Sequence, residues 1–359
     1  MADWSRIVNT TTKNYIKGEE VNILRNRKVL AMLKSKGRIT FGWGGDTMVW
    51  RVRYRRAPMQ GYADSETLTF PRRDRWKTAE LPWRGYASTD SMTKGEKLKN
   101  KGVQAIINIY DEIAKSLMDD MNENFAEELY IDGNATGNGK RIHGAESWLG
   151  AGSTSRDYVA APSDNYAGLS TVLGDYGGSW EDSTKWPSLR GDPQFDFWSP
   201  ILVDYTDSAW EAGTKTWPNT CLEALSYGII KGQRNKSKKG SLDVIFAEGE
   251  LYRQFISRLS EKQRIQIQSN SSNSTMIKLG FTDVQNYDGV DVTWEFGIPS
   301  ATAYGFNFDT LELRSMQGQL FVPEGPDYDI ASKSWRFSID MYGNMVGDPR
   351  SSLKFKNYT

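Results

Sequence analysis

A long amphipathic helical pattern between residues 94 and 129 constrains this fold more than any other feature of the sequence. Thr93 and Glu96 at its start fit a capping box, in which each side chain serves the other's backbone N–H. A continuous helix of this length would run roughly 50 Å at 1.5 Å per residue, which indicates a spine along an elongated molecule. Its apolar residues recur at steps of three and four, as on a helix with one buried face: Val103, Ile106, Ile107, Tyr110, Ile113, Leu117, Met118, Met121 and Phe125.

A basic region with the period of a β-strand precedes the helix. From Met48 to Arg55, apolar or aromatic side chains alternate with Val49 and three arginines, which predicts a strand with one solvated face. Further extended runs are predicted at 68–70 and 76–86. Positions 51–84 hold nine basic minus four acidic residues, a balance of +5, inside a chain of formal net charge +0. An isolated hairpin is only marginally stable, so we expect a neighbouring subunit to stabilise this one.

The remaining sequence predicts a mixed α+β protein with more than one lobe, because 359 residues exceed what a single hydrophobic core usually organises. Residues 1–45 contain too few apolar side chains for a core of their own. Strands are predicted at 201–205 and 242–247, and helices at 217–232 and 248–264. Short strands separated by turns are predicted from residue 276 onward.

Several kinds of active site are disfavoured. Cys221 and His143 are the only cysteine and histidine, so a site with two His ligands or a Cys-rich zinc site is excluded. The Gly-rich stretch at 133–141 fails the phosphate-loop spacing, because five residues separate Gly133 from Gly139 and Arg141 follows the lysine. We therefore predict no enzyme activity, no metal and no cofactor. No signal peptide or membrane-spanning segment is expected either.

The arginines of the hairpin are the candidate functional residues. Aromatic rings lie among them, and this composition favours a protein interface over a merely solvated face. Arginine with aromatic rings also suits single-stranded nucleic acid, so composition alone leaves both options open. The predicted subunit-interface residues are Arg51, Arg53, Arg55, Arg56, Arg72, Arg73, Arg75, Trp76 and Trp83.

The order of these parts resembles the major capsid proteins of tailed bacteriophages, whose fold is often called the Hong Kong ninety-seven fold. The resemblance spans nearly the whole chain and rests on an ordered set of stretches more than on any single motif. These stretches are RITFGWGGDTMVWRVRYRR, DRWKTAELPWRGYASTDSM, EELYIDGNATGNGKRIHG, DVIFAEGELYRQFISRL and IPSATAYGFNFDTLEL.

The resemblance implies a division of the chain and a set of partners. Implied partners are other copies in hexamers and pentamers, a separate scaffolding protein, a portal, a possible decoration protein, and packaged DNA contacted without sequence specificity on the inner face. Implied locations are the virion capsid and, during assembly, the cytoplasm of the bacterial host. The implied parts are an N-terminal arm at 1–45, an extension loop at 46–93, a peripheral domain at 94–215 with its spine helix at 94–129, an axial domain at 216–310, and strands at 311–359 that return to the peripheral domain.

Three other functions remain open from the residues alone. A tail or decoration component of a virion would show the same lack of catalytic motifs. A carbohydrate-binding module or hydrolase would suit the abundant Trp and Tyr, but a hydrolase needs two carboxylates about 5 to 9.5 Å apart. A nucleic-acid-binding protein would use the basic hairpin, although the overall neutrality of the chain counts against it.

Overall fold

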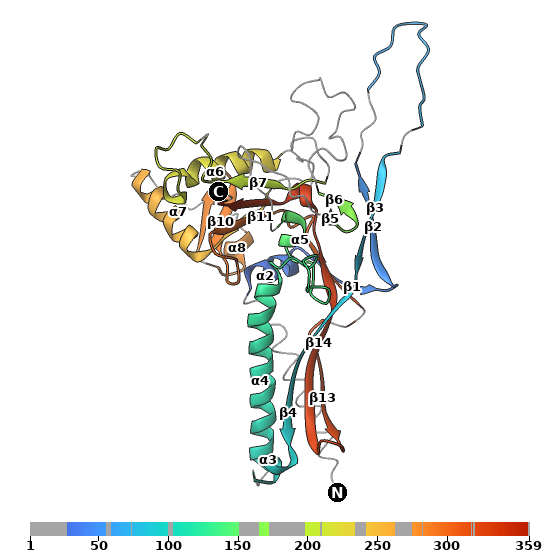
Figure 1. Cartoon of the computed structure of the whole chain (residues 1–359), viewed down its shortest axis with the longest axis vertical. Helices are drawn as coiled ribbons and strands as arrows, with labels where there is room; N and C mark the ends of the chain where they lie inside the picture. Colours follow the sequence, from blue (N-terminus) through green and yellow to red (C-terminus); the bar gives the residue numbers. More distant parts are fainter. Residues whose placement is uncertain are drawn as a thin grey trace.

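In the computed structural model, the described parts of the chain form two lobes and a projecting hairpin (Figure 1). One lobe is a broad α/β body, and the other is a long helix lying beside strands. The described residues are 27–54, 59–72, 74–99, 103–150, 165–171, 198–208, 210–233, 242–262, 275–281, 283–316, 318 and 320–357.

The elongated lobe is built on a five-stranded sheet whose central element is β14 (Ser334–Val346). β4 (Arg84–Thr93) pairs antiparallel with β14 over ten residues, and β13 (Val322–Asp329) pairs with β14 on its other side. β12 (Glu312–Met316) pairs with the end of β14, and β1 (Ile39–Trp43) lies parallel to β12. Alternate β14 side chains are buried, namely Phe337, Ile339 and Met341.

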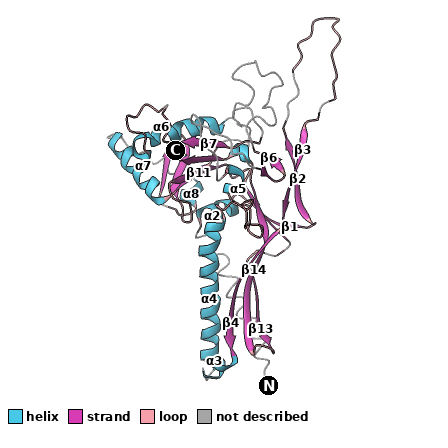
Figure 2. Ribbon diagram, viewed as in Figure 1, coloured by secondary structure: helices cyan, strands magenta, loops and turns pink. Residues whose placement is uncertain are grey.

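The predicted spine helix is confirmed from residue 103 to residue 128. α3 (Lys94–Lys99) and α4 (Val103–Glu128) are separate elements, and residues 100–102 between them lie outside the described residues. The predicted capping box is present, because the Thr93 N–H donates to Glu96 Oε2 at 2.8 Å and the Glu96 N–H to Thr93 Oγ1 at 3.4 Å. Figure 2 shows α4 running beside β4, β14 and β13.

The broad lobe contains a six-stranded sheet with helices α6 (Trp217–Gly232) and α7 (Gly249–Lys262) packed on one face. β7 (Ile201–Asp204), β8 (Val244–Ala247) and β11 (Thr302–Phe306) are buried on both faces, and their sequences are mostly apolar or aromatic without the alternation of a half-exposed strand. Alternate side chains enter the two cores: Ile245 packs in the cluster under α6 and α7, whereas Phe246 packs toward α4. The strand order is β7, β15 (Leu353–Lys356), β11, β8, β10 (Val290–Trp294) and β9 (Val284–Tyr287).

Sheet pairing crosses the two sequence boundaries predicted for the axial domain. β7 precedes residue 216 and β15 follows residue 311, yet both belong to the six-stranded sheet. They pair in parallel with each other, which puts β7 at the sheet edge and β15 next to β11. The sequence of β7 or of β15 alone does not indicate which sheet the strand joins, because their parallel pairing joins residues about 150 positions apart.

Candidate functional site: the projecting hairpin and its root

The hairpin consists of β2 (Thr47–Arg53) and β3 (Trp76–Pro82). The strands pair antiparallel from Thr47 opposite Pro82 to Arg53 opposite Trp76. The predicted alternation is confirmed, because Met48 and Tyr54 are buried while Val49, Arg51 and Arg53 are exposed. The predicted run at 76–86 is split, since β4 leaves the hairpin after Trp83 and joins β14.

The loop between the strands is exposed throughout residues 59–72. The strand predicted at 68–70 is wrong: these residues form no ladder, and the Gln60 side chain instead holds Thr69 through bonds to its carbonyl (2.8 Å) and its N–H (3.2 Å). Met59 is 99% exposed and Phe70 is 89% exposed. Large apolar side chains held away from any core are typical of a contact surface.

The predicted interface residues occupy different environments. Arg51, Arg53, Arg72 and Trp76 are exposed, whereas Arg75 and Trp83 are half-buried. The Trp83 indole N–H donates to the Gly45 carbonyl at 2.9 Å, so this ring fixes the root of the hairpin. The other three predicted residues, Arg55, Arg56 and Arg73, lie outside the described residues.

Backbone and amide contacts join the hairpin root to the body. The Glu80 N–H donates to the Ala167 carbonyl at 3.0 Å, and Asn344 Nδ2 donates to the Pro82 carbonyl at 2.9 Å. Ala79 and Leu81 of β3 are fully buried in the same core as α4 and the five-stranded sheet. The root is therefore part of the body, and only the distal loop projects.

His143 belongs to this anchor. The residue is 3% exposed, and its Nδ1 lies 2.8 Å from Asn344 Nδ2. Burial, with a smaller contribution from Arg84, lowers the pKa of His143 to about 4. A buried neutral imidazole facing an amide is a structural contact, and no nucleophile bonds to it among the contacts of the described residues.

A cavity of about 520 Å³ opens between β2 and the ends of β12 and β14. Sequence reasoning found Arg51 and Arg53 on its wall but missed the arginines that distant elements contribute. Counting basic residues along the hairpin cannot identify these additional arginines, because they lie elsewhere in the sequence and reach the cavity only through the pairing of β1, β12 and β14. The five arginines of the lining are Arg38, Arg51, Arg53, Arg314 and Arg350.

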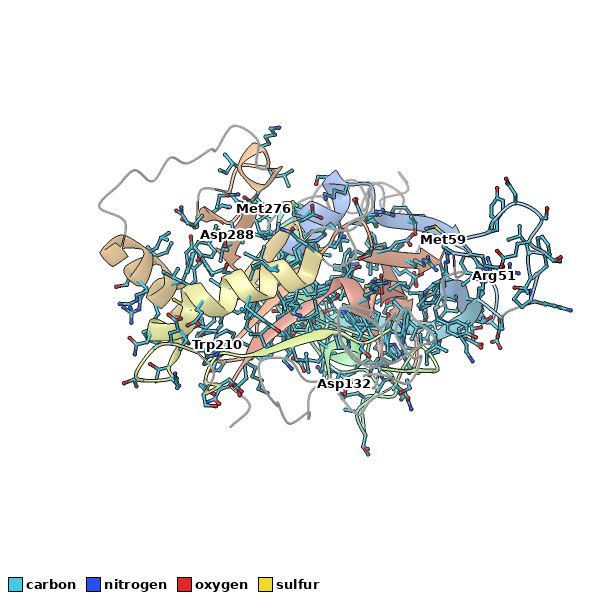
Figure 3. All side chains as sticks on the ribbon, turned by 90° about the horizontal axis from the view of Figure 1, so that it is seen from above. Arg51, Met59, Asp132, Trp210, Met276 and Asp288 are labelled. Atoms are coloured by element: carbon cyan, nitrogen blue, oxygen red, sulfur yellow. The ribbon has the colours of Figure 1, made fainter. Side chains whose placement is uncertain are left out.

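Within the described residues, no group of three or more His, Cys, Asp or Glu side chains is arranged to hold a metal ion. None of their helices combines the length and the apolar character that crossing a membrane requires. Seen from above, Arg51 and Met59 of the hairpin lie at one side of the molecule, with Trp210 and Asp288 toward the other (Figure 3).

Comparison with solved structures identifies the fold. A chain in the capsid asymmetric unit of cyanophage A-1(L) is 15% identical, with a TM-score of 0.58 over 89% of this chain and 90% of that one. This chain has the phage-capsid fold. A chain in the capsid of a native GTA particle is 8% identical, with a TM-score of 0.54 over 91% of each chain. The predicted α+β capsid fold is therefore confirmed.

Comparison of the amino-acid sequence alone gives no match. No family model matches it, and no curated protein does. The overall fold is similar at identities of 8% and 15%, because a core tolerates many apolar substitutions that keep its volume and pattern.

Proposed function

We propose that this chain is the major capsid protein of a tailed bacteriophage, a structural subunit without a catalytic role. Copies assemble into hexamers and pentamers, which close into an icosahedral or prolate head around double-stranded DNA. The match to two capsid chains along nine-tenths of the sequence supports this proposal.

The projecting hairpin is the observation that carries the proposal. Its loop exposes Met59, Tyr62 and Phe70 and buries none of residues 59–72 against its own subunit. Such a loop gains little from its own fold, so a neighbouring copy must cover it. Many such contacts per shell stabilise the assembly even when each is weak.

The two lobes have separate roles in this proposal. The lobe with α4 and the five-stranded sheet is the peripheral domain, and the lobe with the six-stranded sheet is the axial domain around five- and six-fold axes. β12, β13 and β14 return to the peripheral domain, whereas β15 completes the axial sheet. Residues 46–93 form the extension loop, with β4 at its end joining the peripheral sheet.

The proposal also includes the partners of the shell. A separate scaffolding protein directs assembly, a portal occupies one vertex, and a decoration protein is a further possible partner. DNA meets the inner face without sequence specificity. Assembly takes place in the host cytoplasm and requires no cofactor.

Expression of the chain followed by negative-stain electron microscopy tests the proposal, with and without a candidate scaffolding protein. Closed shells, or hexameric and pentameric rings, are expected. Tubes would favour a tail component. Subunits that stay monomeric under both conditions would refute the capsid proposal.

A triple variant tests the part played by the basic hairpin. Replacing Arg53, Arg55 and Arg73 with Glu should reduce assembly while the monomer stays folded, because charge reversal at an interface costs affinity and not core packing. The matched control replaces the same three residues with Lys, which keeps the charge. Normal shells from the Glu variant would exclude electrostatic docking by these arginines.

A further inference from the structure

The cavity at the hairpin root carries an excess of positive charge. Five arginines and three carboxylates line it, a balance of +2. The carboxylates already have partners within the subunit: Glu312 pairs with Arg314 at 2.9 Å, and Asp309 lies 3.9 Å from Arg38. Asp348 caps the short helix η2 (Pro349–Ser351) by accepting the Arg350 N–H at 3.2 Å.

Aromatic rings complete the lining. Trp50 and Trp198 both border the cavity, and the Arg314 guanidinium lies 5.6 Å from the Trp50 ring centre. Guanidinium groups bind carboxylates through paired N–H donors, and tryptophan with arginine dominates tightly bound interface pockets. The mixture of arginine and indole favours a polypeptide segment that carries carboxylates and aromatic rings.

The tip of the hairpin loop has the complementary charge. The arms of the hairpin are basic, but the turn at its end carries Asp64 and Glu66, both exposed. The turn is closed locally, since the Glu66 N–H donates to the Ala63 carbonyl at 3.1 Å and Glu66 Oε2 accepts the Ala63 N–H at 3.0 Å. Exposed Tyr62 and Phe70 flank this acidic turn.

We propose that the acidic tip of one copy's hairpin loop inserts into the arginine-lined cavity at the hairpin root of the next copy. The inference rests on the proposed shell function and names the surface that receives the loop. A subunit cannot fill its own cavity, because its loop projects away from the root (Figure 1). Tip and cavity are different surfaces, so the contact is head-to-tail and closes into a ring when the rotation between copies allows it.

A second hollow among the described residues is a poor receptor for the tip. It measures about 590 Å³ and lies across β4, β14 and β13. Asp90, Glu324 and Asp327 line it against a single arginine, so it would repel Asp64 and Glu66. This hollow provides the control position for the experiment.

Disulfide trapping in assembled particles tests the contact. Cys221, the only native cysteine, is buried and should stay unreactive. Subunits with Arg51→Cys are co-assembled with subunits carrying Glu66→Cys and oxidised, and the control pairs Glu66→Cys with Glu324→Cys. A disulfide-linked dimer is expected from the first pair and not from the second.

Charge reversal gives an independent readout. Asp64→Lys with Glu66→Lys, and Arg51→Glu with Arg53→Glu, should each lower the yield of assembled subunits by about tenfold, the least effect expected of a close interfacial charge pair. Combining all four changes should restore assembly.

The outcomes separate this inference from the proposed function. Particles that assemble but trap no Arg51–Glu66 disulfide, or trap the Glu324 control equally well, would overturn the tip-to-root contact and leave the capsid proposal standing. Wild-type chains that never assemble would overturn both.

Discussion

Acid should weaken the root of the hairpin through His143. Asn344 Oδ1 accepts the N–H groups of His143 (2.8 Å) and Met345 (2.9 Å), which orients its amide nitrogen toward the imidazole. That nitrogen donates to His143 Nδ1 and to the Pro82 carbonyl. Nδ1 is therefore an unprotonated acceptor, and a proton there would face an N–H donor.

The magnitude follows from the pKa of the histidine. Burial lowers this pKa from 6.5 to about 4, so the native state binds fewer protons than the unfolded state between these values. The free energy of unfolding therefore falls as the pH drops from 6.5 toward 4, by about 3 kcal/mol in total at 1.36 kcal/mol per pKa unit. About 2 kcal/mol of this loss should appear between pH 7.5 and pH 5.

Two measurements on unassembled subunits check this prediction. Because the chain has a single histidine, a ring-labelled sample gives one histidine NMR signal, whose titration reports its pKa directly. Urea unfolding of the wild type and of His143→Gln at both pH values isolates the contribution of this residue, because all other groups titrate in both proteins. The stability difference between the two proteins should change by about 2 kcal/mol.

A pKa of His143 near its ordinary value of 6.5 in the NMR titration would refute the prediction. So would a stability difference between the wild type and His143→Gln that stays constant from pH 7.5 to pH 5. Either result would mean that the imidazole is solvated or protonated in the native state.

Three further changes test the core. Lys354→Met should destabilise the subunit by about 3–5 kcal/mol in urea unfolding, because it strips the buried Glu146 carboxylate of its 2.6 Å partner; adding Glu146→Leu should recover most of the loss, and a small single-variant effect would contradict the buried pair. Burial raises the pKa of Glu295 to about 7, so its stabilising contribution is present below pH 4.5 and lost as the pH rises through 7. The free energy of unfolding of Glu295→Gln, relative to that of the wild type, should therefore increase by about 2 kcal/mol between pH 5.5 and pH 8. A difference in unfolding free energy that stays constant over this pH range would exclude this titration. Gly144→Ala should cost about 1–3 kcal/mol in thermal unfolding, because its Cβ would lie 2.5 Å from the Ile131 backbone nitrogen, whereas Gly139→Ala meets no atom within 4 Å and should be neutral.

Local patterns were sufficient for much of the fold. The helical period identified α4 and α6, and the alternation around Trp50 identified β2 with the correct solvated face. The error at 68–70 has the same origin, because a short apolar run is scored as a strand whether or not a partner strand exists. Here no ladder forms, and Phe70 remains exposed.

The buried pair of Lys354 and Glu146 shows where the sequence alone fails. The lysines of the alternating run Leu-Lys-Phe-Lys would ordinarily face solvent, yet Lys354 is fully buried. Its side chain lies on the face of β15 opposite Leu353 and Phe355, and that second face is covered by the segment that includes α5 (Glu146–Leu149). This covering makes the position interior, and bonds from the ammonium to Glu146 (2.6 Å) and to the Gly150 carbonyl (2.9 Å) make its burial tolerable.

By itself the sequence determined the helix, the hairpin with its basic balance, and the absence of two-histidine chemistry, because these depend on residue type and on period over a few turns. The tertiary structure decided which strands pair and where distant charges meet. β7 and β15 joined one sheet across about 150 residues, and pairing of β1, β12 and β14 placed three unsuspected arginines beside Arg51 and Arg53. Such contacts arise from packing between segments far apart in the chain, so no local pattern encodes them.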